Sequence, residues 1–280
     1  MKISFIGLGI MGLPMATNIS KKYDVIGFDI IKKDTPFPFS SSYEECVKDS
    51  DILISMVPNN DNFKNLVNNV KNYLKKGTIW IDMSTISPSV NLEMKELLKE
   101  YDVELCDAPV VKSAPAAIKG ELGIYFGGEK DIFDKVYDIL LCMGKNIIYM
   151  GPSSSGLKMK ILHNALVGEI QNGVNEIISM ADGLGIDLND FIKALGYGGA
   201  QCFYLDTKGK NIINREYPTA FSVENMNKDV HFAKEIADEL NLEVPSLRNV
   251  VNVYEKAMDM GLNKKDFSSS YEVVIKNEVK

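Results

Sequence analysis

The chain has 280 residues, a formal net charge of -7 and 45% hydrophobic residues. That length allows one large domain or two ordinary ones, and the acidic balance argues against nucleic acid as the main partner, because phosphate binding requires a basic surface. With only two histidines and four cysteines, none in a C-x-x-C pair, a His/Cys metal site is not expected.

No apolar run in the sequence approaches the ~18 residues that would span a bilayer, so no membrane segment is expected. The scattered cysteines are expected to be buried thiols in a reducing compartment. These features together predict a cytoplasmic globular enzyme.

The first half of the chain alternates short apolar runs with helical patterns. Strands are predicted at residues 3–6, 25–28, 52–57, 78–83, 103–106 and 146–150, with one more inside 120–128. Helices are predicted over 11–20, from 42, and over 62–74, 88–101 and 131–142. Alternation of this kind predicts an α/β fold of Rossmann type, with a doubly wound parallel sheet and helices on both faces.

The pattern changes after residues 151–156, where the strand-like runs end. Residues 157–184 form one helical pattern of about 28 residues, which is long for a globular domain. Further helices are predicted near 188–195, 204–213, 223–240, 245–260 and 267–275. The sequence therefore predicts a dinucleotide-binding domain over 1–156 and an all-α domain over 157–280.

The glycine spacing at residues 7–12 follows the first predicted strand and opens the first predicted helix. A G-x-G-x-x-G dinucleotide fingerprint requires this context. Gly7 allows a tight turn, Gly9 lets a pyrophosphate approach the backbone, and Gly12 lets the helix lie close on the strand. The helix then offers unpaired N–H groups and a positive dipole end to the phosphates.

Asp29 ends the second predicted strand, where it can accept a hydrogen bond from a ribose 2′-hydroxyl and would repel a 2′-phosphate. Lys32 and Lys33 follow closely enough to offer some affinity for such a phosphate. NAD is therefore the favoured cofactor, and NADP remains the alternative.

Lys160 and Asn164 are four residues apart on the long predicted helix, so they share one face. That helix begins at the domain boundary, where substrate and cofactor are expected to meet. Oxidising an alcohol releases a hydride from carbon and a proton from oxygen, and a lysine can take that proton or return it in reduction. Lys158 lies about 200° round the helix, so Lys160 is the stronger candidate.

Four stretches of the chain stand in the order and spacing of one known family. They are G-L-G-I-M-G-L-P-M-A-T-N at residues 7–18, D-A-P-V-V-K-S at 107–113, G-x-x-x-K-x-x-x-N at 156–164 and K-D-V-x-x-A at 228–233. Together they resemble the β-hydroxyacid dehydrogenases, which include 3-hydroxyisobutyrate dehydrogenase, tartronate semialdehyde reductase and the glyoxylate/succinic semialdehyde reductases.

This resemblance implies an NAD(P)-dependent oxidoreductase acting on a small carboxylate, either a short β-hydroxy acid or its semialdehyde or 2-oxo counterpart. It makes Lys160 the general acid and base and Asn164 the residue that orients it. The loop of Val111, Lys112 and Ser113 would hold the acid group of the substrate. The implied cofactor contacts are Gly7, Leu8, Gly9, Ile10, Met11, Gly12, Asp29, Val57, Pro58, Asn59, Ser84, Thr85 and Lys228. The family also implies a homodimer or homotetramer.

The substrate loop departs from the family, which has S-G-G where this chain has Val111-Lys112-Ser113. Val111 removes a hydroxyl donor, and Lys112 adds a cation beside the same spot. Either Lys112 binds the acid group and the substrate is changed or enlarged, or Lys112 points to solvent and backbone N–H groups alone hold the acid. Ser154 also replaces a glycine common in the family, a mild change at a loop or N-cap position.

Three rival interpretations remain. The K-x-x-H-N sequence at 160–164 also resembles 6-phosphogluconate dehydrogenase, which has a glutamate where this chain has Val167. That resemblance leaves His163 either a direct catalytic role or a packing role on the helix. A non-catalytic NAD(P)-binding scaffold is the rival from another class, although relatives of that kind tend to lose the lysine. Imine reduction uses the same fold with that lysine replaced, so Lys160 argues against it.

Overall fold

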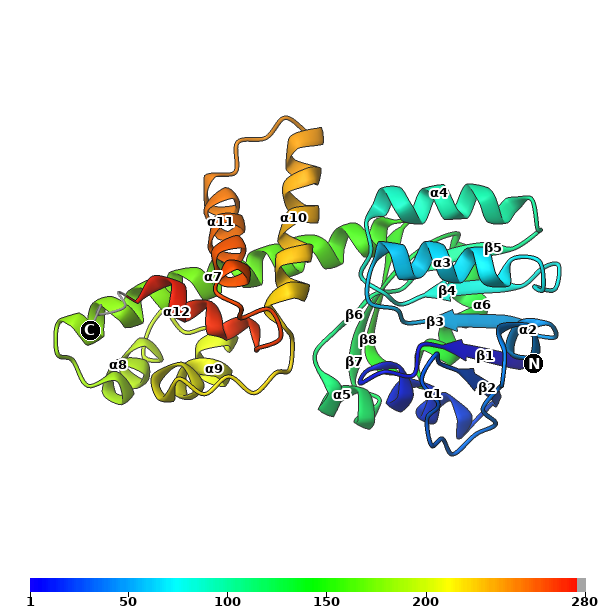
Figure 1. Ribbon diagram of the computed structural model, residues 1–280, viewed down its shortest axis with the longest axis horizontal. Helices are drawn as coiled ribbons and strands as arrows, with labels where there is room; N and C mark the ends of the chain where they lie inside the picture. The colour runs from blue at the N-terminus through cyan, green and yellow to red at the C-terminus, as the bar shows by residue number, and fades with distance from the viewer. Residues whose placement is uncertain (276–280) are drawn as a thin grey trace. The chain divides into compact units, whose positions relative to one another are not determined.

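Figure 1 shows the computed structural model of the chain, which describes residues 1–275. The chain divides into two compact units, Met1–Lys160 and Ile161–Lys280. The division falls within one unbroken helix, α7 (Ser155–Gly183), a few residues beyond the boundary predicted from sequence.

The first unit is built on a sheet in the order β2-β1-β3-β4-β5-β7, with β6 and β8 also paired to β7. The strands are β1 (Lys2–Ile6), β2 (Asp24–Phe28), β3 (Ile52–Ser55), β4 (Ile79–Asp82), β5 (Glu104–Asp107), β6 (Val110–Val111), β7 (Leu122–Gly127) and β8 (Gly144–Gly151). The pairs among β1 to β5 are parallel, as the alternating pattern predicts. The carboxyl ends of these strands therefore lie along one edge, where α/β folds bind their ligands.

β7 is an exception within the predicted parallel, doubly wound sheet, because it pairs antiparallel with β5 and β6 and parallel with β8. The sequence pattern missed both β6 and the six-residue helix α5 (Ala114–Lys119). β6 follows β5 along the same edge of β7, and α5 turns the chain back instead of carrying it across a face of the sheet. Strands of two residues and helices of two turns are too short to produce a periodic signal.

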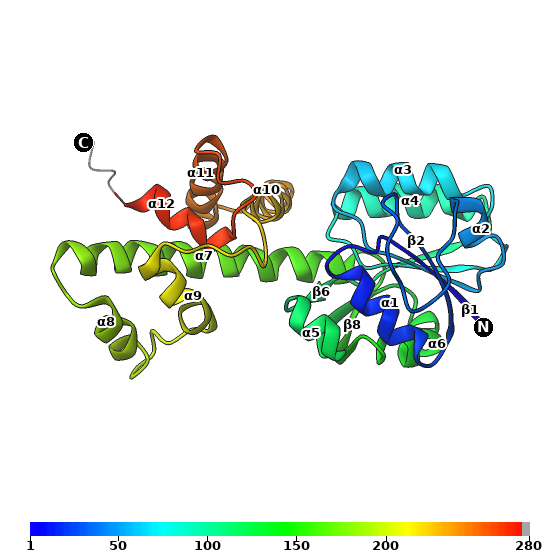
Figure 2. The same cartoon turned by 60° about the horizontal axis from the view of Figure 1, so that its bottom comes forward.

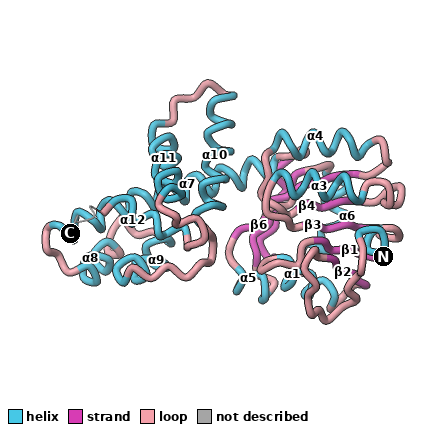
Figure 3. Tube along the Cα trace, in the orientation of Figure 1, coloured by secondary structure: helices cyan, strands magenta, loops and turns pink. Residues whose placement is uncertain are grey.

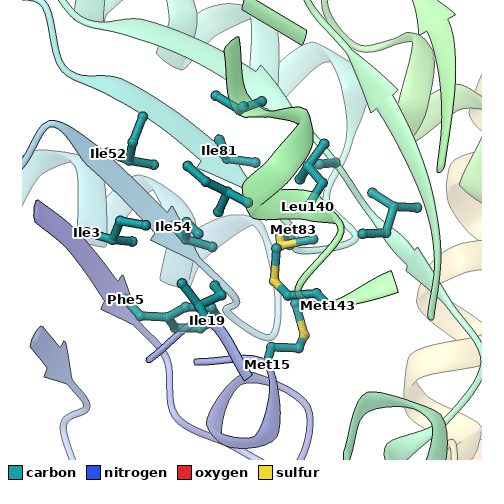
Figure 4. Close-up of a cluster of buried hydrophobic side chains, with 14 of the residues drawn as sticks. Ile3, Phe5, Met15, Ile19, Ile52, Ile54, Ile81, Met83, Leu140 and Met143 are labelled. Atoms are coloured by element: carbon teal, nitrogen blue, oxygen red, sulfur yellow. The ribbon is translucent and has the colours of Figure 1, made fainter. Parts of the chain in front are cut away.

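Helices cover both faces of this sheet, as Figure 2 shows, with α3 and α4 on one side and α1 and α6 on the other. They are α1 (Gly12–Ser20), α2 (Tyr43–Val47), α3 (Asn60–Val70), α4 (Pro88–Lys99) and α6 (Lys130–Leu140). The core under α1 and α6 includes Phe5, Met15, Ile54 and Met143, which Figure 4 shows packed together. The alternation of apolar strands with amphipathic helices thus produces two apolar layers around one sheet.

The second unit is helical, as predicted, and its described residues form no strand beyond one isolated bridge between Ser222 and Asp266. Figure 3 shows α7 with the shorter helices that follow it. These are α8 (Leu188–Leu195), α9 (Phe203–Asn214), α10 (Val223–Glu239), α11 (Pro245–Asp259), a 3-10 helix (Phe267–Ser270) and α12 (Tyr271–Val274). Gly168 lets α10 and α11 approach α7, because a Cβ there would lie 3.1 Å from Val250 and 3.5 Å from Val230.

Residues 1–275 contain neither a helix suited to spanning a membrane nor a cluster of side chains suited to holding a metal ion. No helix among them is both long enough and apolar enough to cross a membrane. Within the same residues, no cluster of three or more His, Cys, Asp or Glu side chains could hold a metal ion. All four cysteines are free thiols.

Candidate active site

The turn between β1 and α1 has the geometry of a phosphate cradle. Gly7 has φ +96°, and a Cβ there would lie 2.1 Å from the carbonyl oxygen of Met56. A Cβ on Gly12 would lie 1.9 Å from the carbonyl oxygen of Gly7. Gly9 differs, because its Cβ would meet nothing within 4 Å. The chain itself therefore requires glycine at 7 and 12, whereas the open space at Gly9 fits a bound pyrophosphate.

The first turn of α1 is open to such a ligand. Met11 precedes the helix and its side chain makes no capping hydrogen bond, so capping does not satisfy the first N–H groups of α1. Ile10 is 80% exposed, whereas Leu8 is buried in the core. Leu13 donates its N–H to the carbonyl oxygen of Gly9 at 3.1 Å and Pro14 has no N–H, so the N–H groups that this turn can offer an anion lie before Leu13, at the positive end of the helix dipole.

Asp29 ties this turn to the end of β2. Its Oδ2 accepts the backbone N–H of Leu8 at 2.7 Å, and its Oδ1 accepts the N–H of Ile31 at 2.9 Å. The carboxylate thus fixes the glycine turn, a role that sequence analysis did not assign to it. Each oxygen has a second lone pair, so Asp29 keeps the capacity to accept a ribose hydroxyl.

The loops that follow β3 and β4 are joined through a buried carboxylate, Asp82. Ser55 and Ser84 donate their hydroxyls to its Oδ1 at 2.6 and 2.7 Å. The Ser84 oxygen in turn accepts the N–H of Val57 at 2.8 Å. Burial raises the pKa of Asp82 to about 6, against the hydrogen bonds from the two serines. Sequence analysis predicted Ser84 and Val57 as cofactor contacts but missed Asp82, which fixes both loops.

The rest of these two loops is held by asparagines. Asn59 caps α3, because its Oδ1 accepts the N–H of Asn62 at 2.9 Å. Asn60 accepts the N–H of Ser87 at 2.9 Å and so joins the loop after β3 to the loop after β4. Pro58 and Asn59 are exposed and Thr85 is partly buried. The predicted cofactor residues of both loops therefore lie at the carboxyl end of the parallel strands.

The substrate loop differs from what its family motif implies. Val111 packs on the sheet, where a Cβ on Gly123 would lie 2.5 Å from its Cγ2. Lys112 has φ +78°, its side chain is exposed, and its Nζ donates to the carbonyl oxygen of Glu121 at 2.8 Å. Ser113 precedes α5 but its hydroxyl makes no capping bond to that helix.

Lys160 and Asn164 are both buried on α7, with 9% and 5% of their surfaces exposed, whereas Lys158 is exposed. The amide of Asn164 donates to Oδ2 of Asp229 at 2.6 Å, and Lys228 donates to Oδ1 of the same carboxylate at 2.9 Å. A carboxylate only accepts, so the NH₂ of Asn164 faces Asp229 and its carbonyl oxygen is left to accept a hydrogen bond elsewhere. Asp229 stands beside the predicted Lys228 in sequence, but sequence analysis gave it no role.

The residues behind the 6-phosphogluconate dehydrogenase alternative do not complete an acid site. Val167, at the position of that family's glutamate, packs against the apolar core of the helical unit. His163 is partly buried on α7. The position that would supply the acid is therefore occupied by an apolar contact.

Matches to known protein families cover almost the whole chain. Residues 2–151 match a family model described as the NAD binding domain of 6-phosphogluconate dehydrogenase. Residues 154–274 match one described as NAD-binding of NADP-dependent 3-hydroxyisobutyrate dehydrogenase. Human mitochondrial 3-hydroxyisobutyrate dehydrogenase is 30% identical over 294 residues, covering 99% of this chain and 87% of that protein. The chain belongs to the β-hydroxyacid dehydrogenase family.

As a β-hydroxyacid dehydrogenase, the chain is an oxidoreductase with NAD(P)-binding domains that acts on the CH–OH group of a hydroxy acid or on its carbonyl counterpart. The 2-(hydroxymethyl)glutarate dehydrogenase of Eubacterium barkeri is 28% identical over 283 residues, covering 97% of this chain and 94% of that one. The fold is shared with a solved 3-hydroxyisobutyrate dehydrogenase of Mycobacterium tuberculosis, with a TM-score of 0.87, 24% identity and 98% of each chain covered.

Proposed function

We propose that this β-hydroxyacid dehydrogenase uses Lys160 as the proton donor and acceptor in a reaction between NAD and a short β-hydroxy acid. The observation that carries the proposal is a buried lysine that shares one face of α7 with a buried asparagine. A primary amine can give a proton as its ammonium and take one as the free base, and the reaction requires both.

Lys160 and Asn164 of α7, supported by two residues of α10, have distinct roles in this proposal. Bound nicotinamide supplies the hydride or takes it up. In reduction, Lys160 gives a proton from its ammonium to the carbonyl oxygen of the substrate, and in oxidation its neutral amine takes the proton back. Asn164, with its NH₂ held by Asp229, presents its carbonyl oxygen as the acceptor that orients either the lysine or the substrate hydroxyl. Lys228 holds the other oxygen of Asp229 and so supports the asparagine indirectly.

The preference for NAD rests on Asp29. Its carboxylate receives two backbone N–H groups, and a negative charge at the end of β2 opposes a 2′-phosphate. Lys32 is exposed and Lys33 is partly buried in the loop beyond it. We expect kcat/KM to be higher with NADH than with NADPH. Asp29→Asn should bring the two kcat/KM values closer together. A native preference for NADPH would refute this role of Asp29.

The substrate loop favours an acid with a second charged group. The Lys112 ammonium is exposed and donates to the backbone carbonyl oxygen of Glu121, an uncharged partner that a carboxylate could replace. The relative from Eubacterium barkeri is named for a substrate with two acid groups, 2-(hydroxymethyl)glutarate. We expect Lys112→Ala to raise the KM for 2-(hydroxymethyl)glutarate more than the KM for 3-hydroxyisobutyrate. Equal effects on both substrates would place the side chain of Lys112 outside the site.

The experiment that tests the activity is a panel of short hydroxy acids and aldehydes with both cofactors. The wild type should turn over at least one β-hydroxy acid, and Lys160→Ala should lose about 100- to 10,000-fold in kcat, the usual contribution of a general acid or base. Lys158→Ala is the matched control, because its side chain is exposed one helix face away. A wild type that binds NADH tightly but turns over nothing would favour the scaffold alternative.

An oligomer is proposed on the strength of α7. Five large apolar side chains on it are exposed, including Leu162 at 54% and Met180 at 62%. The full set is Leu162, Leu166, Ile170, Ile177 and Met180. Apolar surface of this extent on one helix is typical of a buried contact between chains. Sedimentation should show a dimer or tetramer, and Leu166→Lys with Met180→Lys should shift it to monomer.

A further inference from the structure

Asp107 heads the substrate motif, but its carboxylate does not face the substrate loop. It is fully buried at the end of β5. Its Oδ1 accepts the backbone N–H of Ser154 at 2.6 Å, and its Oδ2 accepts the N–H of Leu157 at 2.8 Å. Ser154 directly precedes α7 and Leu157 lies in its first turn, so the aspartate caps a helix that starts 48 residues further along the chain.

Asp107, at the end of β5, supplies the cap because Ser154, the residue before the helix, does not. The first N–H groups of a helix have no partner inside it, and a serine that precedes a helix commonly satisfies one of them. The hydroxyl of Ser154 instead lies 3.0 Å from Oδ1 of Asn91 and 3.3 Å from the carbonyl oxygen of Pro88. Without Asp107, the N–H groups of Ser154 and Leu157 would be buried without an acceptor.

The backbone packs closely round this carboxylate. A Cβ on Gly127 would lie 2.5 Å from Oδ1 of Asp107. A Cβ on Gly156 would lie 2.8 Å from Oδ2 and 2.2 Å from the carbonyl oxygen of Tyr125. The end of β5, the end of β7 and the first turn of α7 are therefore fixed against one another without room for adjustment.

Gly156 and Lys160 are four residues apart on α7 and share one face of it. Lys160 therefore lies one turn beyond the point where Asp107 holds the helix. Any shift or tilt of the first turn changes the position of the Lys160 side chain.

We propose that Asp107 is a positioning residue, which fixes the Lys160 side chain by capping the first turn of α7. This inference rests on the proposed role of Lys160 and adds to it the group that sets where the lysine lies. Burial raises the pKa of Asp107 to about 7, against the hydrogen bonds from the two backbone N–H groups, so the carboxylate is held where desolvation is costly.

The test compares steady-state kinetics of three variants with the wild type. Asp107→Asn keeps the shape but turns one N–H of its amide toward a backbone N–H. We expect kcat to fall about 10- to 100-fold, as for a small displacement of a catalytic group, while the KM for NADH stays within about twofold. Gly156→Ala should give the same split by displacing the first turn. Asp51→Asn is the control, because Asp51 also accepts a backbone N–H, that of Lys2 at 2.9 Å, at the start of β3.

The outcomes separate the two proposals. If Lys160→Ala is inactive and folded Asp107→Asn keeps full kcat, then Asp107 has only a structural role and this inference is overturned. If Asp51→Asn lowers kcat as much as Asp107→Asn, general destabilisation explains the loss and the inference also fails. If Lys160→Ala keeps full activity, the proposed function itself is wrong. Thermal melts on every variant identify any that does not fold, and Gly156→Ala then carries the comparison alone.

Discussion

The glycine turn and the substrate loop each contain a residue with positive φ, but only the turn has glycine at that position. In the turn, the strained position at φ +96° is occupied by Gly7, and the close contact is made by Gly12. In the loop, φ +78° is held by Lys112, a residue for which the left-handed region costs about 1–2 kcal/mol. The glycine turn therefore avoids this cost, whereas the loop with Lys112 bears it, as Asp102 and Ser154 also do. At a proposed binding loop, such a cost supports the hypothesis that the side chain is required there.

The largest expected effect distinguishes a glycine that leaves space for a ligand from a glycine that the fold itself requires. Gly9→Ala places a methyl in open space, so the fold should keep its stability. The same methyl would occupy the approach of the pyrophosphate, and we expect NADH binding to weaken by about 100-fold, equivalent to ~2.8 kcal/mol. Titration of protein fluorescence with NADH measures this.

Gly12→Ala is the matched variant. Its Cβ would meet a backbone oxygen at 1.9 Å, and we expect the free energy of unfolding to fall by about 2–4 kcal/mol with binding lost as a consequence. Equal losses of stability in the two variants would contradict the distinction between the chain's own contacts and space for a ligand.

The stability of the first unit should depend on pH through Asp82, which joins the loops after β3 and β4 by hydrogen bonds. Burial raises the pKa of this carboxyl from 3.8 to about 6, so between these values the folded state holds a proton that the unfolded state has lost. The contribution of Asp82 to stability is therefore full below pH ~4, falls as the pH rises toward ~6, and is lost above that, by up to about 3 kcal/mol at ~1.4 kcal/mol per pKa unit.

The measurement is urea denaturation of the wild type and Asp82→Asn across pH 4 to 8. The difference between the two should change over pH 4 to 6 and be constant above. Asp51→Asn should show a pH dependence of stability of the opposite sign, because hydrogen bonds from Lys75 and from the N–H of Lys2 lower the pKa of Asp51. Plots of unfolding free energy against pH that run parallel for the wild type and Asp82→Asn would contradict a raised pKa at Asp82.

The smallest effect tests the strain at the substrate loop. Lys112→Gly should raise the free energy of unfolding by up to about 1 kcal/mol, because glycine adopts φ +78° at little cost. Lys112→Ala removes the ammonium but keeps the strain, so it should not be stabilised. Both variants should lose affinity for a dicarboxylic substrate to the same extent. A destabilised glycine variant would show that the side chain of Lys112 supports the fold rather than the substrate.

Sequence predicted the parts of the molecule that local pattern encodes. The glycine turn, the parallel strands up to β5 and the helical second unit all carry a periodic or motif signal within a few residues. The cap of α7 by Asp107 and the hold of Asp229 on Asn164 join residues 47 or more apart, and no spacing in the sequence marks such pairs. The antiparallel β7 was missed for a related reason, because direction depends on a two-residue strand and a six-residue helix.

The central claim is that Lys160 transfers the proton, and chemical rescue tests it most directly. Single-turnover reduction is followed at saturating NADH in the wild type, Lys160→Ala and Lys158→Ala, with and without a small primary amine such as ethylamine. If Lys160 transfers the proton, only Lys160→Ala loses the hydride-transfer rate, by about 100-fold or more, and added amine restores part of that rate in proportion to its concentration. A Lys160→Ala variant that reacts at the wild-type rate without amine would contradict the account.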